Sequence, residues 1–258
     1  MTITIEDVKQ LRNKTGVSIM QCKKALEEAE GDMEKALINL TKKSGEIAAK
    51  KGDRDLGAGV VSIVKEGDKT VVLELACETD FVANNEEFGA LAQEIAGWVL
   101  AGEVSTNDDE KITARLAEAT QKFGERTEVV RFDTVEGATG AYVHSNKLIA
   151  AVVGFEGDVD ETLAKQIAMH ISAQNPKYML ESEITDEEMA KAKEVLAEEV
   201  ADKPADMQEK ILEGKINAYF KERVLMKQAF IMDPSKTVAD ALGGANLVRF
   251  VRYGVGEA

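Results

Sequence analysis

Apolar residues recur every three or four positions in three short stretches near the start of the chain. This spacing is typical of amphipathic helices that bury one face. Each stretch begins at a residue type that commonly caps a helix, Thr4, Ser18 or Asp32, and Gly16 is placed to end the first. The pattern therefore predicts a compact bundle of three short helices over residues 1–43.

This bundle resembles ubiquitin-associated (UBA) domains, which often bind partners through the loop that precedes their second helix. Val17, Ile19 and Met20 lie in that loop, and the resemblance implies that they are exposed. The other interpretation is that the three side chains complete a very small core. Residues 44–59 are rich in Gly, Ala and charged residues, and they predict a linker that is helical in part.

The rest of the chain runs twice through a hairpin, a helical segment and a later third strand. Apolar patterns predict strands at residues 60–64, 71–77 and 129–135 in the first unit, and at 141–144, 148–155 and 247–255 in the second. Residues with helical spacing separate the second and third strands of each unit. We therefore expect an α+β fold with two related subdomains, residues 60–136 and 137–258, each an antiparallel sheet covered by helices.

A highly charged segment, residues 183–227, interrupts the second unit and has helical spacing. Pro204 divides it into two helices, because proline cannot continue a helix. Each half carries only a narrow apolar stripe. Two antiparallel helices joined along that stripe would form a coiled-coil hairpin that projects as an arm. The alternative is two ordinary helices that lie on the surface of the core.

The composition favours some classes of function over others. A net charge of −15 disfavours nonspecific binding to nucleic acid. No stretch approaches the roughly 20 apolar residues that cross a bilayer, so we expect a cytoplasmic protein without a membrane partner. The two cysteines and two histidines are not at metal-ligand spacing, and glycine-rich phosphate loops and nucleophile motifs are missing. These features favour a binding protein, with no cofactor or metal of its own, over an enzyme.

Thr79, Asp80, Phe81 and Val82 lie between a predicted buried strand and a predicted helix. A carboxylate beside a large aromatic ring on such a loop is well placed to probe the surface of another protein. The other interpretation makes Phe81 a core aromatic residue and Asp80 a helix cap.

The string Cys77-Glu78-Thr79-Asp80-Phe81-Val82-Ala83 resembles the core signature of the elongation factor Ts family. Further segments match the family in the same order: Thr15-Gly16, Cys22-Lys23-Lys24-Ala25-Leu26, Tyr142-Val143-His144, Ile167-Ala168-Met169-His170 and Asp233-Pro234-Ser235-Lys236-Thr237. The chain departs from the family at Ile19 and Gln21, where Met and Asp are common, and at Ala229, which replaces a proline.

The resemblance implies a protein that binds elongation factor Tu and speeds the release of GDP from it. In the family, the Asp-Phe pair enters beside the magnesium site of the partner. Carried onto this chain, Asp80 and Phe81 would disturb the magnesium ion, and Thr79 and Val82 would hold the shape of the loop. The nucleotide and the ion belong to the partner.

The resemblance also implies partner contacts away from this loop. Val17, Ile19 and Met20 would bind the nucleotide domain of the partner, and His144 would contact it near the phosphate loop. An exposed hairpin residue without a role is the other interpretation of His144. Whether the protein also associates weakly with itself stays an open question.

Two further functions compete with nucleotide exchange. An adaptor would use the helical head and the arm to hold a partner without affecting its nucleotide. An enzyme would need a deep pocket with convergent polar groups at the junction of the subdomains. An exposed Phe81 and the lack of such a pocket would favour the exchange factor over the enzyme.

Overall fold

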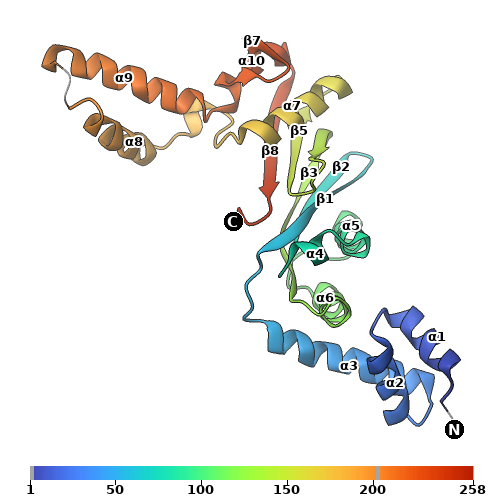
Figure 1. Ribbon diagram of the computed structural model, residues 1–258. Coiled ribbons are helices and arrows are strands. Elements are labelled where there is room, and N and C mark those ends of the chain that lie inside the picture. The colour runs from blue at the N-terminus through green and yellow to red at the C-terminus, as the bar shows by residue number, and fades with distance from the viewer. Residues whose placement is uncertain (1–2, 202–203, 258) are drawn as a thin grey trace.

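The computed structural model describes residues 3–201 and 204–257. The molecule is elongated, with a helical head at one end, two sheets in the middle and a helical projection at the other end (Figure 1). Within the described residues, no helix is both long and apolar enough to cross a membrane.

The head consists of α1 (Ile5–Thr15), α2 (Ile19–Glu28) and the first part of α3 (Met33–Lys51). The three predicted caps are present: the side chain of Thr4 accepts the N–H of Asp7, Ser18 that of Gln21, and Asp32 those of Glu34 and Lys35. The helix α3 continues to Lys51 and packs against α6 (Glu110–Phe123), so the first half of the expected linker is helical.

The first sheet is antiparallel and has the strand order β1-β2-β3. Its strands are β1 (Ala58–Glu66), β2 (Lys69–Cys77) and β3 (Thr127–Glu136). Between β2 and β3 the chain forms α4 (Asp80–Ala83), α5 (Glu86–Leu100) and α6, and apolar residues of these helices pack on one face of the sheet.

The second sheet repeats this arrangement, with the order β4-β5-β8. Its strands are β4 (Ala138–Val143), β5 (Ile149–Glu156) and β8 (Asn246–Gly254), and α7 (Glu161–Gln174) covers its outer face. Gly140 permits the close approach of β4 to α7, since a Cβ atom there would lie 2.1 Å from the carbonyl oxygen of Ala164. In both units the third strand pairs with the second strand of the hairpin, so the predicted pair of related antiparallel units is confirmed.

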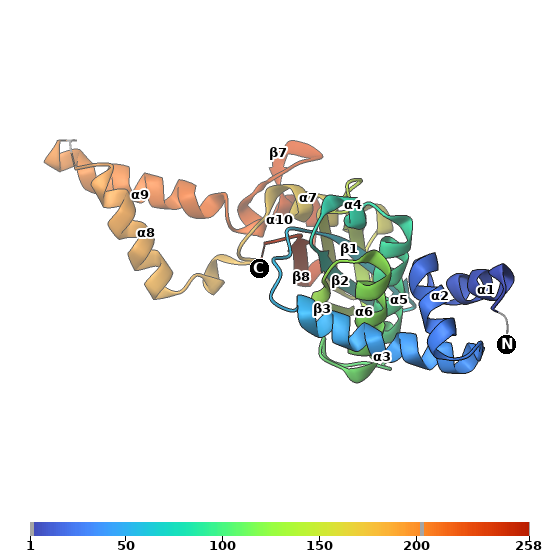
Figure 2. The ribbon, with the colours of Figure 1, turned by 60° about the horizontal axis from the view of Figure 1, so that its bottom comes forward.

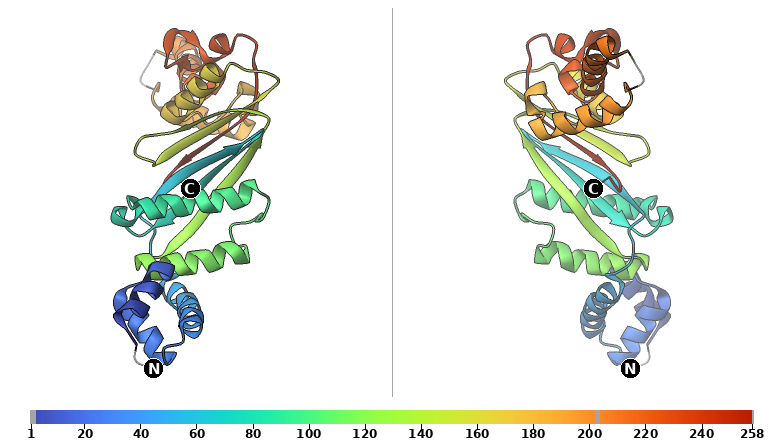
Figure 3. Two further views of the ribbon diagram at one scale, coloured as in Figure 1. Left: turned by 90° about the vertical axis from the view of Figure 1, so that its right-hand side faces the viewer. Right: turned by 90° about the vertical axis from the view of Figure 1, so that its left-hand side faces the viewer.

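The two sheets pack face to face, and the helices cover their outer faces (Figure 3). Consecutive residues of β2 alternate between the layer under α5 and the layer between the sheets, and β5 does the same on its side. The shared layer contains Val61, Val72 and Val135 from the first sheet and Ala150, Val152, Val251 and Tyr253 from the second. This double burial explains why the central strands do not alternate between apolar and polar residues: residues 149–155 of β5 form a continuous apolar run, and Glu74 alone interrupts the run from Val71 to Cys77 in β2.

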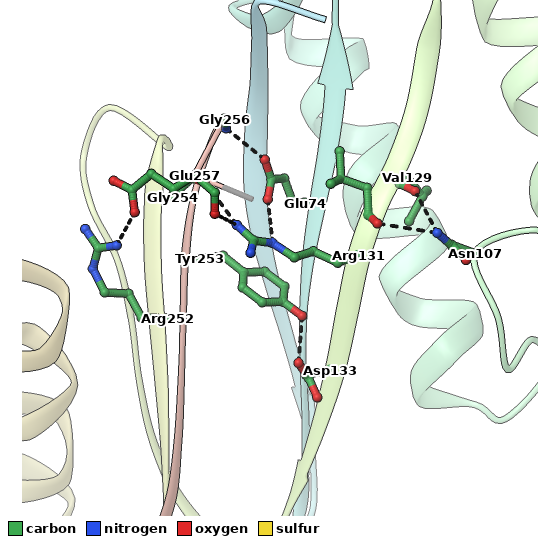
Figure 4. Close-up of polar contacts among 11 residues, drawn as sticks. Glu74, Asn107, Val129, Arg131, Asp133, Arg252, Tyr253, Gly254, Gly256 and Glu257 are labelled. Carbon is green, nitrogen blue, oxygen red and sulfur yellow. Dashed lines mark hydrogen bonds and ion pairs between the residues drawn. The ribbon is translucent and has the colours of Figure 1, made fainter. Parts of the chain in front are cut away.

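A polar network also joins the sheets (Figure 4). Glu74 on β2 is buried, and its carboxylate accepts hydrogen bonds from Nε of Arg131 at 2.8 Å and from the N–H of Gly256 at 3.1 Å. The hydroxyl of Tyr253 on β8 donates to Asp133 on β3 at 2.7 Å. The end of the chain is therefore tied to the first sheet by hydrogen bonds as well as by apolar packing.

The segment between α7 and β8 forms the projection and a small group of short elements beside it (Figures 1 and 2). It contains η1 (Glu181–Glu183), α8 (Asp186–Glu198), α9 (Ala205–Lys221), η2 (Leu225–Lys227), β6 (Ala229–Phe230), β7 (Asp233–Thr237) and α10 (Val238–Leu242). The predicted division into two helices at Pro204 is confirmed, with α9 starting directly after it. The strands β6 and β7 and the helix α10 were not predicted, because each is five residues or shorter and carries no measurable periodicity.

Apolar contacts at the base of the projection join α8 and α9 to the body. Ala192 of α8, Phe220 of α9 and the neighbouring Tyr178 and Val224 form one buried cluster. The buried imidazole of His170 on α7 holds the segment that follows α9. Its Nε2 lies 2.9 Å from Oε1 of Gln228, and its Nδ1 accepts the N–H of Ile231.

Candidate functional site

The segment from Thr79 to Ala83, predicted to be a loop, contains one turn of helix. Thr79 occupies the N-cap position of α4, and its carbonyl oxygen accepts the N–H of Ala83 at 3.2 Å. Asn85 then caps α5 by accepting the N–H of Glu87. Asp80 lies in the first turn of α4 and not at its cap, so the interpretation of Asp80 as the cap is wrong.

The ring of Phe81 is 86% exposed, the highest fraction among the exposed large hydrophobic residues of the described chain. Its neighbours behave differently: Ala83 is buried and Val82 packs partly against the core under α5. The interpretation of Phe81 as a core residue is therefore wrong. Leaving a phenylalanine in water forgoes about 1.5–3 kcal/mol of burial free energy, so the structure holds an apolar group where it can meet another surface.

Two carboxylates hold the base of this turn, and sequence reasoning identified neither. Glu125 accepts hydrogen bonds from the N–H and the hydroxyl of Thr79, at 2.9 and 2.6 Å. Glu78 accepts the N–H of Arg126 at 2.6 Å, and Nη1 of Arg54 donates to both of its carboxylate oxygens, at 2.9 and 3.2 Å. The N–H of Arg126, followed by the guanidinium of Arg54, lowers the pKa of Glu78. Since Arg54 lies in the segment that joins α3 to β1, the turn and the connection to the head share one polar network.

His144 is exposed in the tight connection between β4 and β5, and its Nδ1 lies 3.0 Å from the hydroxyl of Tyr142. The same connection is attached to the first sheet, because the N–H of Val61 donates to the carbonyl oxygen of Lys147 at 2.8 Å. Lys147 lines a groove of about 330 Å³ together with Glu86 from the start of α5. The fold thus brings the connection that carries His144 beside the helix that follows the exposed Phe81.

The head residues that were predicted to bind a partner divide into two groups. Ile19 and Met20 are 59% and 81% exposed on α2, but Val17 is only 3% exposed. The expectation that Val17 is exposed is wrong, because the side chain packs in the head core with Leu11 and Cys22. In so small a bundle each inward-facing position is needed to fill the core.

The head meets the body at α6 and not at α4. A groove of about 460 Å³ separates the loop after α1 from the helices α5 and α6, with Gly16 and Leu40 on one side and Glu87 and Lys122 on the other. Ile19 and Met20 belong to α2, which lies apart from α4, the turn that carries Phe81 (Figure 2). Among residues 3–201 and 204–257, no three His, Cys, Asp or Glu side chains gather closely enough to hold a metal ion.

Comparison with known protein families adds a finding that is independent of this geometry. The sequence model of the family described as Elongation factor TS matches residues 78–257. The matched range starts one residue before Thr79 and includes the Phe81 turn, His144, the whole second sheet and the helical projection. The helical head and the strands β1 and β2 up to Cys77 lie outside it.

Proposed function

The chain belongs to the elongation factor Ts family, and on that premise we propose that it binds elongation factor Tu and accelerates the release of GDP. The family acts in translation elongation as nucleotide exchange factors and not as enzymes in the usual sense. The exchange would proceed by protein contact alone. The guanine nucleotide and the magnesium ion belong to the partner, so the protein needs no cofactor of its own, and it would act in the cytoplasm with translation.

The observation that carries this proposal is the exposure of Phe81 on a turn whose base is held by hydrogen bonds. The partner retains GDP partly through a magnesium ion that neutralises phosphate charge. An aromatic ring and a carboxylate, Phe81 and Asp80, entering beside that ion would displace its surroundings and weaken the hold on the phosphates. Because binding is reciprocal, a factor that prefers the nucleotide-free partner must lower the affinity of the partner for nucleotide.

The other contacts are proposals that rest on the family and on exposure. We propose that Ile19 and Met20 of a UBA-like head contact the nucleotide domain of the partner, with Val17 supporting them from the core. His144 would contact the partner near its phosphate loop. The helices α8 and α9 would act as a coiled-coil arm inserted in a second subdomain, and the division into head, linker, two subdomains and arm would follow the boundaries stated above.

Release of a fluorescent GDP from elongation factor Tu tests the proposal, with magnesium present and the factor well below stoichiometric amounts. Wild type, Phe81→Ala and Ile5→Ala are compared. Ile5 is another large, exposed apolar residue and serves as the matched control. We expect fast release with wild type and Ile5→Ala, and loss of most of the acceleration with Phe81→Ala.

An adaptor that holds the partner without exchanging its nucleotide is the second candidate, favoured by the separate apolar surface on the head. It predicts binding of wild type, measured by calorimetry, without faster release of GDP. Binding without acceleration would overturn the exchange function and leave the adaptor. Acceleration that survives in Phe81→Ala would keep the exchange function and move its mechanism away from the turn.

A further inference from the structure

Thr79 has an unusual set of hydrogen bonds for a threonine at the start of a helix. A threonine hydroxyl at the N-cap normally accepts an N–H of the first turn. Here the side chain makes no such cap, and the hydroxyl donates to Oε1 of Glu125 instead. The N–H of Thr79 donates to the other oxygen, and its carbonyl oxygen accepts from the thiol of Cys77 at 3.2 Å. The N–H and the hydroxyl of the residue before Asp80 are thus held from outside the helix.

Glu125 and Glu78 form a reciprocal pair of contacts across two chain segments. The ladder between β2 and β3 ends at the pairing of Cys77 with Thr127. Beyond it, the carboxylate of Glu78 accepts the N–H of Arg126, while the carboxylate of Glu125 accepts the N–H of Thr79. Side chains therefore continue the pairing of the two strands for two residues after the backbone ladder has ended.

The turn needs this support because it cannot hold itself. A helix of four residues is far below the length at which helices are stable alone. The ring of Phe81 makes little contact that could fix it, since it is exposed. Glu125 is partly buried and follows Gly124, whose left-handed φ of 75° ends α6 and sets the course of the chain. Hydrogen bonds to a partly buried carboxylate are stronger than those between neutral groups.

We propose that Glu125 is a positioning residue for nucleotide exchange, which holds the Phe81 turn in its binding geometry before the partner arrives. This inference rests on the proposed exchange function. It assigns the pre-ordering of the turn to a residue 46 positions away in the chain. Without Glu125, the turn would have to be ordered at each encounter, and this would slow release without removing any contact with the partner.

The experiment measures GDP release with four variants: Glu125→Ala, Thr79→Val, the double variant that combines these two, and the conservative variant Thr79→Ser. Glu125→Ala should lower the accelerated GDP release by about tenfold or more, since a hydrogen bond to a charged group is lost. The double variant should lose no more than Glu125→Ala alone, because the two residues act as one unit. Thr79→Ser keeps the hydroxyl and should release GDP nearly as wild type does. Glu118→Ala is the matched control, because it removes an exposed carboxylate of α6 that pairs with Arg115.

Hydrogen exchange at the amide of Thr79 gives a readout that does not depend on activity. Glu125→Ala should abolish protection of this amide, while amides in the middle of β2 stay protected. Unchanged protection and unchanged release in Glu125→Ala would overturn the inference, as would additive losses in the double variant. If wild type itself fails to accelerate release, the exchange function fails, and the amide of Thr79 still shows whether Glu125 orders the turn.

Discussion

Breaking the buried ion pair of the first sheet should destabilise the protein strongly. Glu74 is 2% exposed, and Nε of Arg131 donates to it at 2.8 Å from the directly opposite position on β3. Arg131 also donates through Nη2 to the carbonyl oxygens of Gly254 and Glu257, at 3.2 and 2.8 Å. Its guanidinium lies 4.3 Å from the ring centre of Tyr253 (Figure 4).

The size of the effect follows from what Arg131→Ala leaves behind. The carboxylate of Glu74 would remain buried with the N–H of Gly256 as its remaining donor. Removing one partner of a buried pair typically costs about 3–5 kcal/mol. The side chain of Arg131 is 29% exposed, so water can reach part of the site, and we expect about 3 kcal/mol. Replacing both Glu74 and Arg131 by Leu removes the stranded charge, and should cost clearly less than Arg131→Ala alone.

Urea unfolding at neutral pH, followed by the fluorescence of Trp98, measures this effect. Trp98 is the sole tryptophan and packs against the core of the first unit. Lys69→Ala is a matched control, because Lys69 faces Glu136 across the same two strands, but this pair is exposed and 3.8 Å apart. We expect the control to lose less than about 1 kcal/mol. Equal losses in Arg131→Ala and Lys69→Ala would refute the argument from burial.

Burial or exposure gives further predictions at four other residues. Phe81→Ala should keep the free energy of unfolding within about 0.5 kcal/mol of wild type, because its ring is exposed. Phe88→Ala should lower the free energy of unfolding by about 3–5 kcal/mol, because its ring is fully buried. Similar losses in Phe81→Ala and Phe88→Ala, measured by urea unfolding, would contradict this. Burial lowers the pKa of His170 from the ordinary 6.5, so below that pH the unfolded chain binds more protons than the folded one. Stability should therefore fall as the pH drops below about 6.5, and His170→Gln should flatten this slope, whereas an unchanged slope would exclude His170 as its source. Burial raises the pKa of the Cys77 thiol to about 12, so iodoacetamide should modify it only as the protein unfolds, and rapid labelling of the native protein, found by mass spectrometry, would contradict the burial.

Local patterns predicted most of the secondary structure. Thr4, Ser18 and Asp32 cap the three helices of the head, because a cap requires only a side chain and an N–H two or three residues away. The hairpins and their returning strands also lie where the apolar patterns placed them. The turn α4 and the short elements β6, β7 and α10 were missed, because elements of two to five residues are held by their surroundings and leave no periodic signal.

The sequence suggested which residues form the candidate site, which stays a prediction, but it did not suggest the contacts that hold them. The resemblance to a family pointed to Asp80, Phe81 and His144, and the structure shows Phe81 exposed and His144 on a connection attached to the first sheet. The role of Glu125 could not be foreseen, because a single glutamate after a helix has no distinctive pattern. Val17 was misplaced for a related reason: an apolar residue in a loop is equally compatible with a surface and with a small core.

The sequence by itself determined which of the longer segments become helices and strands, because caps, turns and apolar spacing act over a few residues. It also indicated a buried strand at residues 71–77, an apolar run interrupted only by Glu74, but not what packs on its two faces. Only the tertiary structure decided what covers those faces and what holds the exposed turn. Glu125 reaches Thr79 across 46 residues, and Gly256 reaches Glu74 across 182. Contacts over such separations depend on how the two sheets stack, and no local pattern encodes that stacking.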